Sequence, residues 1–164
     1  MISSELLELK NWKCVDVNYS HINYAKANTP SKPGLYLIFT NTPISDFNTL
    51  KTNIDKGAVD IRLRTSNPFK ISHELLIQEN ANNNYCVYIG HHKNLRQRIK
   101  EHFWGSNGTG CLSLFKHKSL TKFKWQFYYL EISKLKYGED SNLLRTILES
   151  KLKSHFGWPI LCAR

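Results

Sequence analysis

The sequence predicts an α+β fold, because segments with the period of a strand and segments with the period of a helix follow one another along the chain. Residues 34–40 are apolar and rich in aromatic and β-branched side chains, and residues 85–89 are also apolar, as in buried strands. Over residues 122–130 aromatic side chains occupy alternate positions, which is the period of a third strand. Apolar residues at helical spacing predict helices over about 94–104 and 141–155.

The composition predicts one folded domain, residues 1–164. Hydrophobic residues make up 41% of the chain and aromatic residues 12%, which is enough to bury a core and excludes a disordered protein. The longest apolar runs are about half a membrane span, and the N-terminus has no basic region followed by an apolar one. We therefore expect neither a membrane helix nor a secretory signal. The four cysteines are widely spaced, which predicts a cytoplasmic protein without disulfides.

The charge balance indicates the class of partner. Lysine and arginine outnumber aspartate and glutamate by 23 to 13, for a formal net charge of +10. That charge favours a polyanionic partner, and nucleic acid is favoured over an acidic membrane because no long basic amphipathic helix is visible. Net charge does not report on the fold, so a protein that is basic without binding nucleic acid stays an open alternative.

Two helices have clear limits in the sequence. Asn94 can cap the helix over residues 94–104, and the helix over residues 141–155 begins near Ser141. The first helix has a core-facing stripe at four-residue intervals, formed by Leu95, Ile99 and Phe103. The side chains expected to point inward from the second are Leu144, Ile147, Leu148 and Leu152. A further short helix is predicted over residues 1–12, within an N-terminal extension of residues 1–33.

Residues 41–84 form an insertion between the first two predicted strands, too short to bury much of a core alone. Side chains alternate over residues 59–65, which predicts a half-buried strand. Its inward positions would be Val59, Ile61 and Leu63. Arg62 and Arg64 would then form a basic outer face suited to phosphate or guanine contact, with a solvated strand face as an equal alternative. A helix is predicted over residues 72–79.

The most informative stretch runs from Tyr88 to Phe103 and is typical of a strand end, a turn at Gly90 and a helix. Arg98 and His102 are four residues apart, so they lie on the same face of that helix. An always-charged guanidinium beside a titratable imidazole suits work on a phosphate, because one group binds the oxyanion and the other moves a proton.

This stretch resembles the second half of the GIY-YIG endonuclease signature, and Gly34-Leu35-Tyr36 resembles the first half, with leucine for the usual isoleucine. Members of that superfamily carry a tyrosine in each tripeptide and an arginine ten residues after the second tyrosine. An aromatic residue or histidine follows four residues later, and a glutamate lies on a later helix. The resemblance covers roughly residues 33–40 and 85–160. The long insertion departs from the family pattern, as does the absence of an asparagine after Pro159.

The resemblance implies a small antiparallel sheet of three strands flanked by helices, and hydrolysis of a DNA phosphodiester with Mg²⁺ or Mn²⁺. The positions that match the family's catalytic residues are Tyr36, Tyr88, Arg98, His102 and Glu149. One of the two tyrosines would activate water, and the sequence leaves the choice between them open. Arg98 would stabilise the phosphate, His102 would relay a proton and Glu149 would hold the metal.

Each site residue also has an ordinary structural explanation, Tyr36 and Tyr88 as strand aromatics and His102 as a surface histidine of the helix. The basic side chains of the first helix suit phosphate contact or a merely solvated face, and they are Lys93, Arg96, Arg98 and Lys100. Glu149 has Arg145 four residues before it and Lys153 four residues after it, which leaves a surface ion pair as the alternative. His91 directly follows Gly90 and is a candidate for positioning the phosphate.

The function expected from these observations is a metal-dependent DNA endonuclease. A site-specific, restriction-type enzyme would take base contacts from the insertion and the N-terminal segment, and a homodimer would suit a palindromic site. A repair, mobile-element or toxin nuclease is an alternative, as is a catalytically silent nucleic-acid-binding module on the same fold. The complete set of tyrosines, arginine, histidine and glutamate argues against a silent module.

Overall fold

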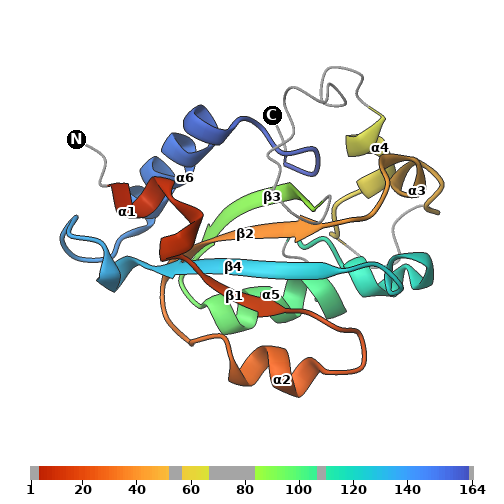
Figure 1. Ribbon diagram of the computed structural model, residues 1–164, viewed down its shortest axis with the longest axis horizontal. Coiled ribbons are helices and arrows are strands. Elements are labelled where there is room, and N and C mark those ends of the chain that lie inside the picture. Colours follow the sequence, from red (N-terminus) through yellow and green to blue (C-terminus); the bar gives the residue numbers. More distant parts are fainter. Residues whose placement is uncertain (1–3, 52–56, 67–83, 107–109, 163–164) are drawn as a thin grey trace.

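In the part of the chain that the structure describes, four antiparallel strands form one sheet with helices on both faces, as the computed structural model in Figure 1 shows. The described residues are 4–51, 57–66, 84–106 and 110–162. The strand order is β1-β4-β2-β3. The strands are β1 (Lys13–Asp16), β2 (Gly34–Thr40), β3 (Tyr85–His92) and β4 (Trp125–Glu131). The predicted α+β class and small antiparallel sheet are confirmed, with one strand more than the three predicted.

The helices are mostly short. They are α1 (Ser4–Leu7), α2 (Ile22–Ala27), α3 (Ile44–Asn48), α4 (Ile61–Thr65), α5 (Leu95–Trp104) and α6 (Asn142–Phe156). Single 3-10 turns occur at Leu9–Asn11, Leu114–Lys116, Lys118–Leu120 and Ile132–Lys134. No helix among the described residues has the length and apolar character that crossing a bilayer requires. All four cysteines are free thiols.

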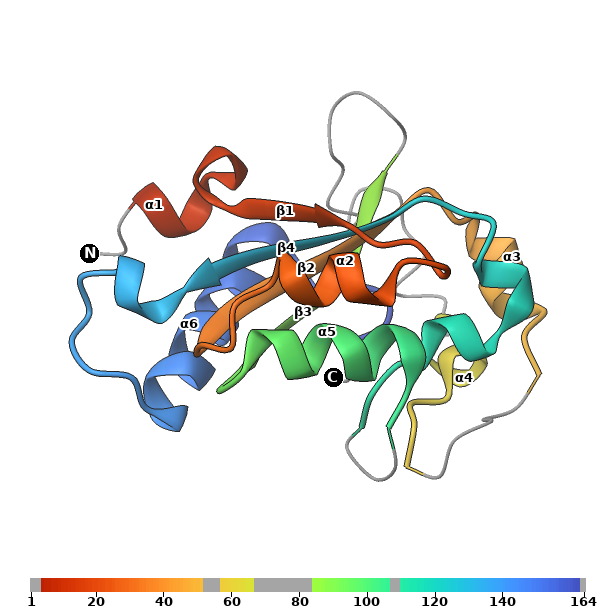
Figure 2. The same ribbon diagram turned by 90° about the horizontal axis from the view of Figure 1, so that it is seen from below.

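Strand β2 is the centre of the molecule, because all seven of its residues are buried. Its side chains alternate between two hydrophobic clusters. Tyr36 and Ile38 face the cluster that contains the apolar stripe of α5, and Leu35 and Leu37 face the cluster that contains α1 and α6. Figure 2 shows α5 in front of the sheet and α6 behind it. The sheet is thus the middle of three layers, and β2 is covered on both faces.

The predicted helix over residues 1–12 is wrong for most of its described length. After α1 the chain makes a 3-10 turn at Leu9–Asn11 and enters β1, which pairs with β4. The buried indole of Trp12 accounts for the change, since its Nε1–H donates to the carbonyl of Leu6 at 3.1 Å. Burying that ring outweighs the weak helix preference of so short a segment. The N-terminal extension therefore supplies the fourth strand.

Helix α5 has the limits predicted for it. The Asn94 side chain accepts a hydrogen bond from the Gln97 N–H at 3.0 Å, which caps the first turn. The predicted stripe of Leu95, Ile99 and Phe103 is fully buried. The helix stops at Gly105, whose φ of 93° lies in the left-handed region that glycine tolerates best. Burial of this stripe fixes the rotation of α5 about its axis.

Helix α6 is rotated slightly from the predicted orientation. Ser141 caps it by accepting the Leu144 N–H, and Leu148 and Leu152 are buried as predicted. Ile147, however, is 47% exposed, so its predicted inward position is wrong. Residues one apart on a helix differ by about 100° in direction, which turns Ile147 away when Leu148 faces the sheet.

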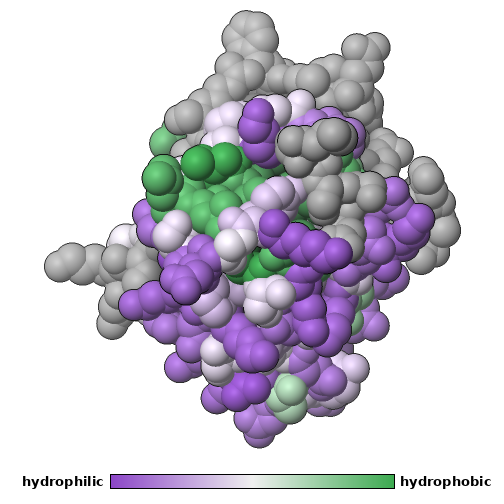
Figure 3. Space-filling view, turned by 90° about the vertical axis from the view of Figure 1, so that its left-hand side faces the viewer, coloured by the Kyte–Doolittle hydropathy of each residue, from purple (hydrophilic) through white to green (hydrophobic). Residues whose placement is uncertain are grey.

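Figure 3 views the end of the molecule that carries α1 and α6 and shows hydrophobic side chains gathered among hydrophilic ones.

The predicted strand over residues 59–65 is also wrong, because residues 61–65 form helix α4. The Asp60 carboxylate caps this helix by accepting the Leu63 N–H at 3.0 Å. Ile61 and Thr65 are buried at a helical spacing of four, and Leu63 is exposed instead of packing inward. The helix predicted over residues 72–79 lies outside the described residues.

Pairing with β2 sets the direction of Tyr88, which lies next to a β-bulge in β3. Ile38 pairs with Tyr88 but Phe39 pairs with Cys86, so Val87 is an extra residue in β3. Directly paired residues point to the same face of a sheet, and Tyr88 therefore shares the α5 face with Ile38. Tyr88 is also two residues from Gly90, which pairs with Tyr36, so these two positions share that face. β3 also extends to His92, so Gly90 and His91 lie in the strand and not in the predicted turn.

Substitutions on α6 should separate its buried side from its exposed side. We expect Leu152→Ala to lower the free energy of unfolding by about 2–5 kcal/mol, because the residue is fully buried. Ile147→Ala, on the same helix, should change it by less than about 1 kcal/mol. Urea unfolding followed by circular dichroism measures both. Equal losses would mean that Ile147 packs in the core.

Candidate active site

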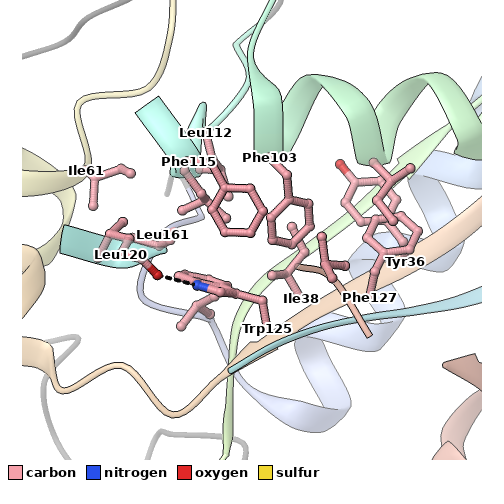
Figure 4. Close-up of a cluster of buried hydrophobic side chains, with 14 of the residues drawn as sticks. Tyr36, Ile38, Ile61, Phe103, Leu112, Phe115, Leu120, Trp125, Phe127 and Leu161 are labelled. Atoms are coloured by element: carbon pink, nitrogen blue, oxygen red, sulfur yellow. Dashed lines mark hydrogen bonds between the residues drawn. The ribbon is translucent and has the colours of Figure 1, made fainter. Parts of the chain in front are cut away.

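Tyr36 lies in the middle of β2 beneath α5, and its side chain is 1% exposed. Figure 4 shows its ring against that of Phe127, with the hydroxyl group toward α5; the two ring centroids are 5.1 Å apart. Gly90 pairs with Tyr36 across the sheet, and a Cβ at this glycine would lie 2.4 Å from the Tyr36 Oη. Any side chain at position 90 would therefore displace the tyrosine, which explains the glycine between Ile89 and His91 in physical terms.

The buried hydroxyl of Tyr36 has two partners on α5. Its Oη lies 2.8 Å from His102 Nε2 and 3.2 Å from Arg98 Nε. Arg98 and His102 are one helical turn apart, so both reach the same point of the sheet as their spacing predicts. The structure thus brings Tyr36, Arg98 and His102 into one hydrogen-bonded cluster, although 62 residues separate Tyr36 from Arg98.

The tautomer of His102 follows from its second partner. Its Nδ1 accepts a hydrogen bond from the Leu112 N–H at 3.2 Å, so in the neutral ring the proton is on Nε2. Burial first, and then the charges of Arg98 and His92, hold the pKa of His102 well below its ordinary value, which keeps the ring neutral. His102 therefore donates its Nε2–H to the Tyr36 hydroxyl. A histidine that already donates cannot also accept the tyrosine proton at Nε2, so this geometry supports stabilisation of negative charge on the phenol over the predicted proton relay.

Arg98 is held by a carboxylate that the sequence analysis did not single out. Its Nη1 lies 2.9 Å from Glu101 Oε2, and the Glu101 side chain is only 5% exposed. The other carboxylate oxygen accepts from Gln97 Nε2 at 2.8 Å. Although burial alone lowers the pKa of Arg98, its contacts with Tyr36 and Glu101 raise it overall, so the charge is secure. The three-residue spacing from Arg98 to Glu101 on one helix is the feature of the sequence that could have predicted this ion pair.

Tyr88 stands beside this cluster at the edge strand. Its ring is parallel to that of Tyr36 at 6.0 Å and lies 4.9 Å from the ring of His102. It contacts both hydrophobic clusters, so it marks the place where the two faces of the sheet meet. Burial is the main cause that raises the pKa of both tyrosines, and nearby Arg98 opposes the rise. Neither phenol is ionised at neutral pH in this state of the protein.

Glu149 approaches from α6, on the other face. Its carboxylate forms an ion pair with Lys153, and its Oε2 lies 3.7 Å from His91 Nε2. Arg145, the other predicted partner, pairs with Asp140 instead. Glu149 has no hydrogen bond to the Tyr36 cluster among the described residues, but its negative charge raises the pKa of both tyrosines and so acts within electrostatic reach of them.

The other predicted nucleic-acid contacts are dispersed. On α5, Arg96 and Lys100 are exposed and lie on roughly the opposite side of the helix from Arg98, because each is two residues away from it. Arg96 donates to the carbonyl of Thr29. Lys93 is exposed between β3 and α5, and Arg62 is exposed on α4. Arg64 is half-buried and donates to the carbonyl of Leu161, where the C-terminal segment covers the edge of β3. The predicted outer face shared by Arg62 and Arg64 is therefore wrong.

These features define a class: an α+β domain that places a tyrosine from each of two paired strands beside an arginine and a histidine of one helix. A family model described as the GIY-YIG catalytic domain matches residues 76–157, which is half of the chain. The chain belongs to the GIY-YIG family and carries a nuclease domain of that type, with nucleic acid as its class of substrate. Searches of curated proteins and of solved structures found no match. The matched segment begins after β2 and does not include Tyr36. Tyr36 is placed beside the matched residues by the pairing of β2 with β3.

Nucleases of this family generally depend on a divalent metal, and the chain's donors fit such an ion. Among the described residues no three His, Cys, Asp or Glu side chains gather as a metal cluster. Mg²⁺ needs less, because one or two carboxylates suffice when waters and substrate phosphates complete its shell. Glu149 provides one carboxylate that already has a cationic partner, the ammonium of Lys153. These donors suit a site in which the protein and a substrate phosphate bind the metal together. They do not suit a site in which protein groups supply all of the ligands.

The buried His102 should make stability depend on pH. The unfolded chain has an ordinary histidine pKa of about 6.5, whereas the folded-state pKa is well below it. As pH falls through that range the unfolded state gains a proton that the folded state does not, so the free energy of unfolding should decrease. Urea unfolding between pH 8 and 5 should show a shallower decrease in His102→Gln than in the wild type. His155→Gln, at an exposed position, should keep the wild-type slope, and equal slopes in all three would contradict a neutral His102.

Proposed function

We propose that this protein is a metal-dependent endonuclease that hydrolyses phosphodiester bonds in DNA. The single observation that carries the proposal is the cluster in which the Tyr36 hydroxyl receives hydrogen bonds from Arg98 Nε–H and His102 Nε2–H. Burying a hydroxyl beside a guanidinium and a neutral imidazole costs stability unless every group is paired, so such a cluster is better explained by chemistry than by packing. The net charge of +10 suits a polyanionic substrate.

The two donors on Tyr36 favour it as the group that activates water. The phenol uses its own proton in neither of these hydrogen bonds, and the phenolate that remains after proton loss is stabilised by both donors. Tyr88 is the alternative, since it lies parallel to Tyr36 at the strand edge. Arg98 carries a permanent positive charge and is aligned by Glu101, as required of a group that stabilises the pentacovalent phosphate.

Glu149 is the residue proposed to hold Mg²⁺ or Mn²⁺. A bound divalent ion would neutralise developing charge on the phosphate oxygens and lower the pKa of a nearby acid. The Glu149 carboxylate would orient that ion on the side of the site opposite to α5, because α6 packs on the other face of the sheet. His91 lies close to the same carboxylate and would steady it, in place of the phosphate-positioning role considered from sequence.

A plasmid assay tests the function directly. Supercoiled DNA is incubated with Mg²⁺ or Mn²⁺, with and without EDTA, and the products are separated on a gel. Cleavage that EDTA stops supports the proposal, and binding without cleavage identifies a silent nucleic-acid-binding module. Discrete fragments would indicate a site-specific, restriction-type enzyme, for which we propose a homodimer, and a smear would indicate a non-specific nuclease.

Removing Arg98 should abolish cleavage without unfolding the protein. We expect Arg98→Ala to lower the cleavage rate by about 10²–10³-fold, because a transition-state contact is lost. Arg98→Lys should recover little, since one ammonium cannot serve both Tyr36 and Glu101. Lys118→Ala removes the same charge from an exposed 3-10 turn and should leave the rate unchanged. A folded Arg98→Ala protein that cuts at the wild-type rate would refute the assignment.

Glu149→Gln should separate binding from catalysis. The substitution removes a negative charge near the substrate, so cleavage should be lost while DNA affinity stays equal or rises. Affinity is measured by fluorescence anisotropy and cleavage by the plasmid assay. Glu139→Gln, at an exposed position before α6, is the matched control and should behave as wild type. Full cleavage by Glu149→Gln would return Glu149 to the role of an ion-pair residue.

A further inference from the structure

We propose that Lys153 occupies the cation position at Glu149 and thereby sets how tightly the site binds a divalent metal. The proposal rests on the assignment of Glu149 as the metal-holding residue. In the structure the Lys153 ammonium forms an ion pair with Glu149 Oε1, and His91 lies near the other carboxylate oxygen. The carboxylate assigned to the metal is therefore already neutralised by the chain itself.

The Lys153 contact differs from an ordinary exposed ion pair on a helix. Only 12% of the Lys153 side chain and 21% of the Glu149 side chain are exposed, so the pair is partly shielded from water and salt. The same ammonium lies 4.8 Å from the ring centroid of Trp158, which follows the end of α6. A carboxylate on one side and an aromatic face on the other form a cation site, because both attract positive charge.

Competition follows from this arrangement. A divalent cation needs a Glu149 oxygen, and a cation within a few ångströms of Lys153 is repelled unless the ammonium moves. The lysine stem is flexible, and the indole of Trp158 offers its ammonium a second attractive contact when the carboxylate is taken. Arg145, one helical turn before Glu149, pairs with Asp140 and forms no ion pair with Glu149. Lys153 is therefore the residue whose removal should strengthen metal binding.

Calorimetric titration of Mn²⁺ and Mg²⁺ into the full chain without DNA tests the proposal independently of catalysis. Lys153→Met keeps an unbranched stem against Trp158 and removes the ammonium. We expect it to bind Mn²⁺ roughly three- to tenfold more tightly than wild type, since a competing cation is lost. Lys151→Met removes the same charge from an exposed position two residues earlier on α6, and it should match wild type. Thermal unfolding with added Mn²⁺ gives a second readout, in which Lys153→Met should gain more stability than either reference.

The outcomes distinguish failure of this inference from failure of the metal assignment. Equal tightening in Lys153→Met and Lys151→Met would reduce the effect to net charge, and weaker or unchanged binding in Lys153→Met alone would refute the competition. The double variant Glu149→Gln/Lys153→Met should lose the gain, because the metal has lost its carboxylate. If Glu149→Gln binds Mn²⁺ as wild type does, the metal assignment itself is wrong, and any tightening in Lys153→Met then arises elsewhere.

Discussion

The rest of the site depends on one buried hydroxyl, that of Tyr36. A polar oxygen in the centre of a covered sheet costs about 1–3 kcal/mol if it is left without partners, so the fold must bring donors to it. Arg98 and His102 are those donors, and their reach fixes both the height and the rotation of α5 above β2. The apolar stripe of α5 and the backbone N–H of Leu112 hold the same orientation from the other sides. Packing and hydrogen bonding thus specify a single arrangement.

The edge position of β3 would allow the residues proposed for catalysis, which lie on opposite faces of the sheet, to act on one substrate. A central strand would separate α5 from α6 completely, whereas an edge strand lets a substrate reach both faces around its border. The pairing of Tyr88 with Ile38 places Tyr88 on the same face as Tyr36, and Gly90 leaves the space that the Tyr36 ring fills. The C-terminal segment covers part of the same edge through the hydrogen bond from the Leu161 N–H to the Val87 carbonyl, which also protects a strand that would otherwise be open to pairing.

Elements with strong local signals could be predicted from the sequence, and elements decided by distant contacts could not. The strand around Tyr36 and the helix capped by Asn94 carry their own periodicity and cap, and both were predicted correctly. The strand β1 depends on burial of Trp12 and on pairing with β4, which no local pattern reports. Over a span as short as residues 59–65 the positions of the apolar side chains fit either a strand or a helix. The Asp60 carboxylate, which accepts the Leu63 N–H, stabilises the helix. The candidate residues Tyr36, Arg98 and His102 converge as their family spacing implies, but the bracing role of Glu101 required the structure.

The two carboxylates of the site are suited to different tasks by their surroundings. Glu101 is almost fully buried, and both of its oxygens are engaged, one by the Arg98 guanidinium and the other by Gln97. A pair so enclosed cannot exchange its cation without leaving a buried charge unpaired, which makes Glu101 a permanent brace for Arg98. Glu149 is more exposed, and its partner is a flexible ammonium on a four-carbon stem. Burial therefore separates a fixed cation on α5 from an exchangeable one on α6, which is what the roles proposed for Arg98 in the transition state and for Glu149 in metal binding require.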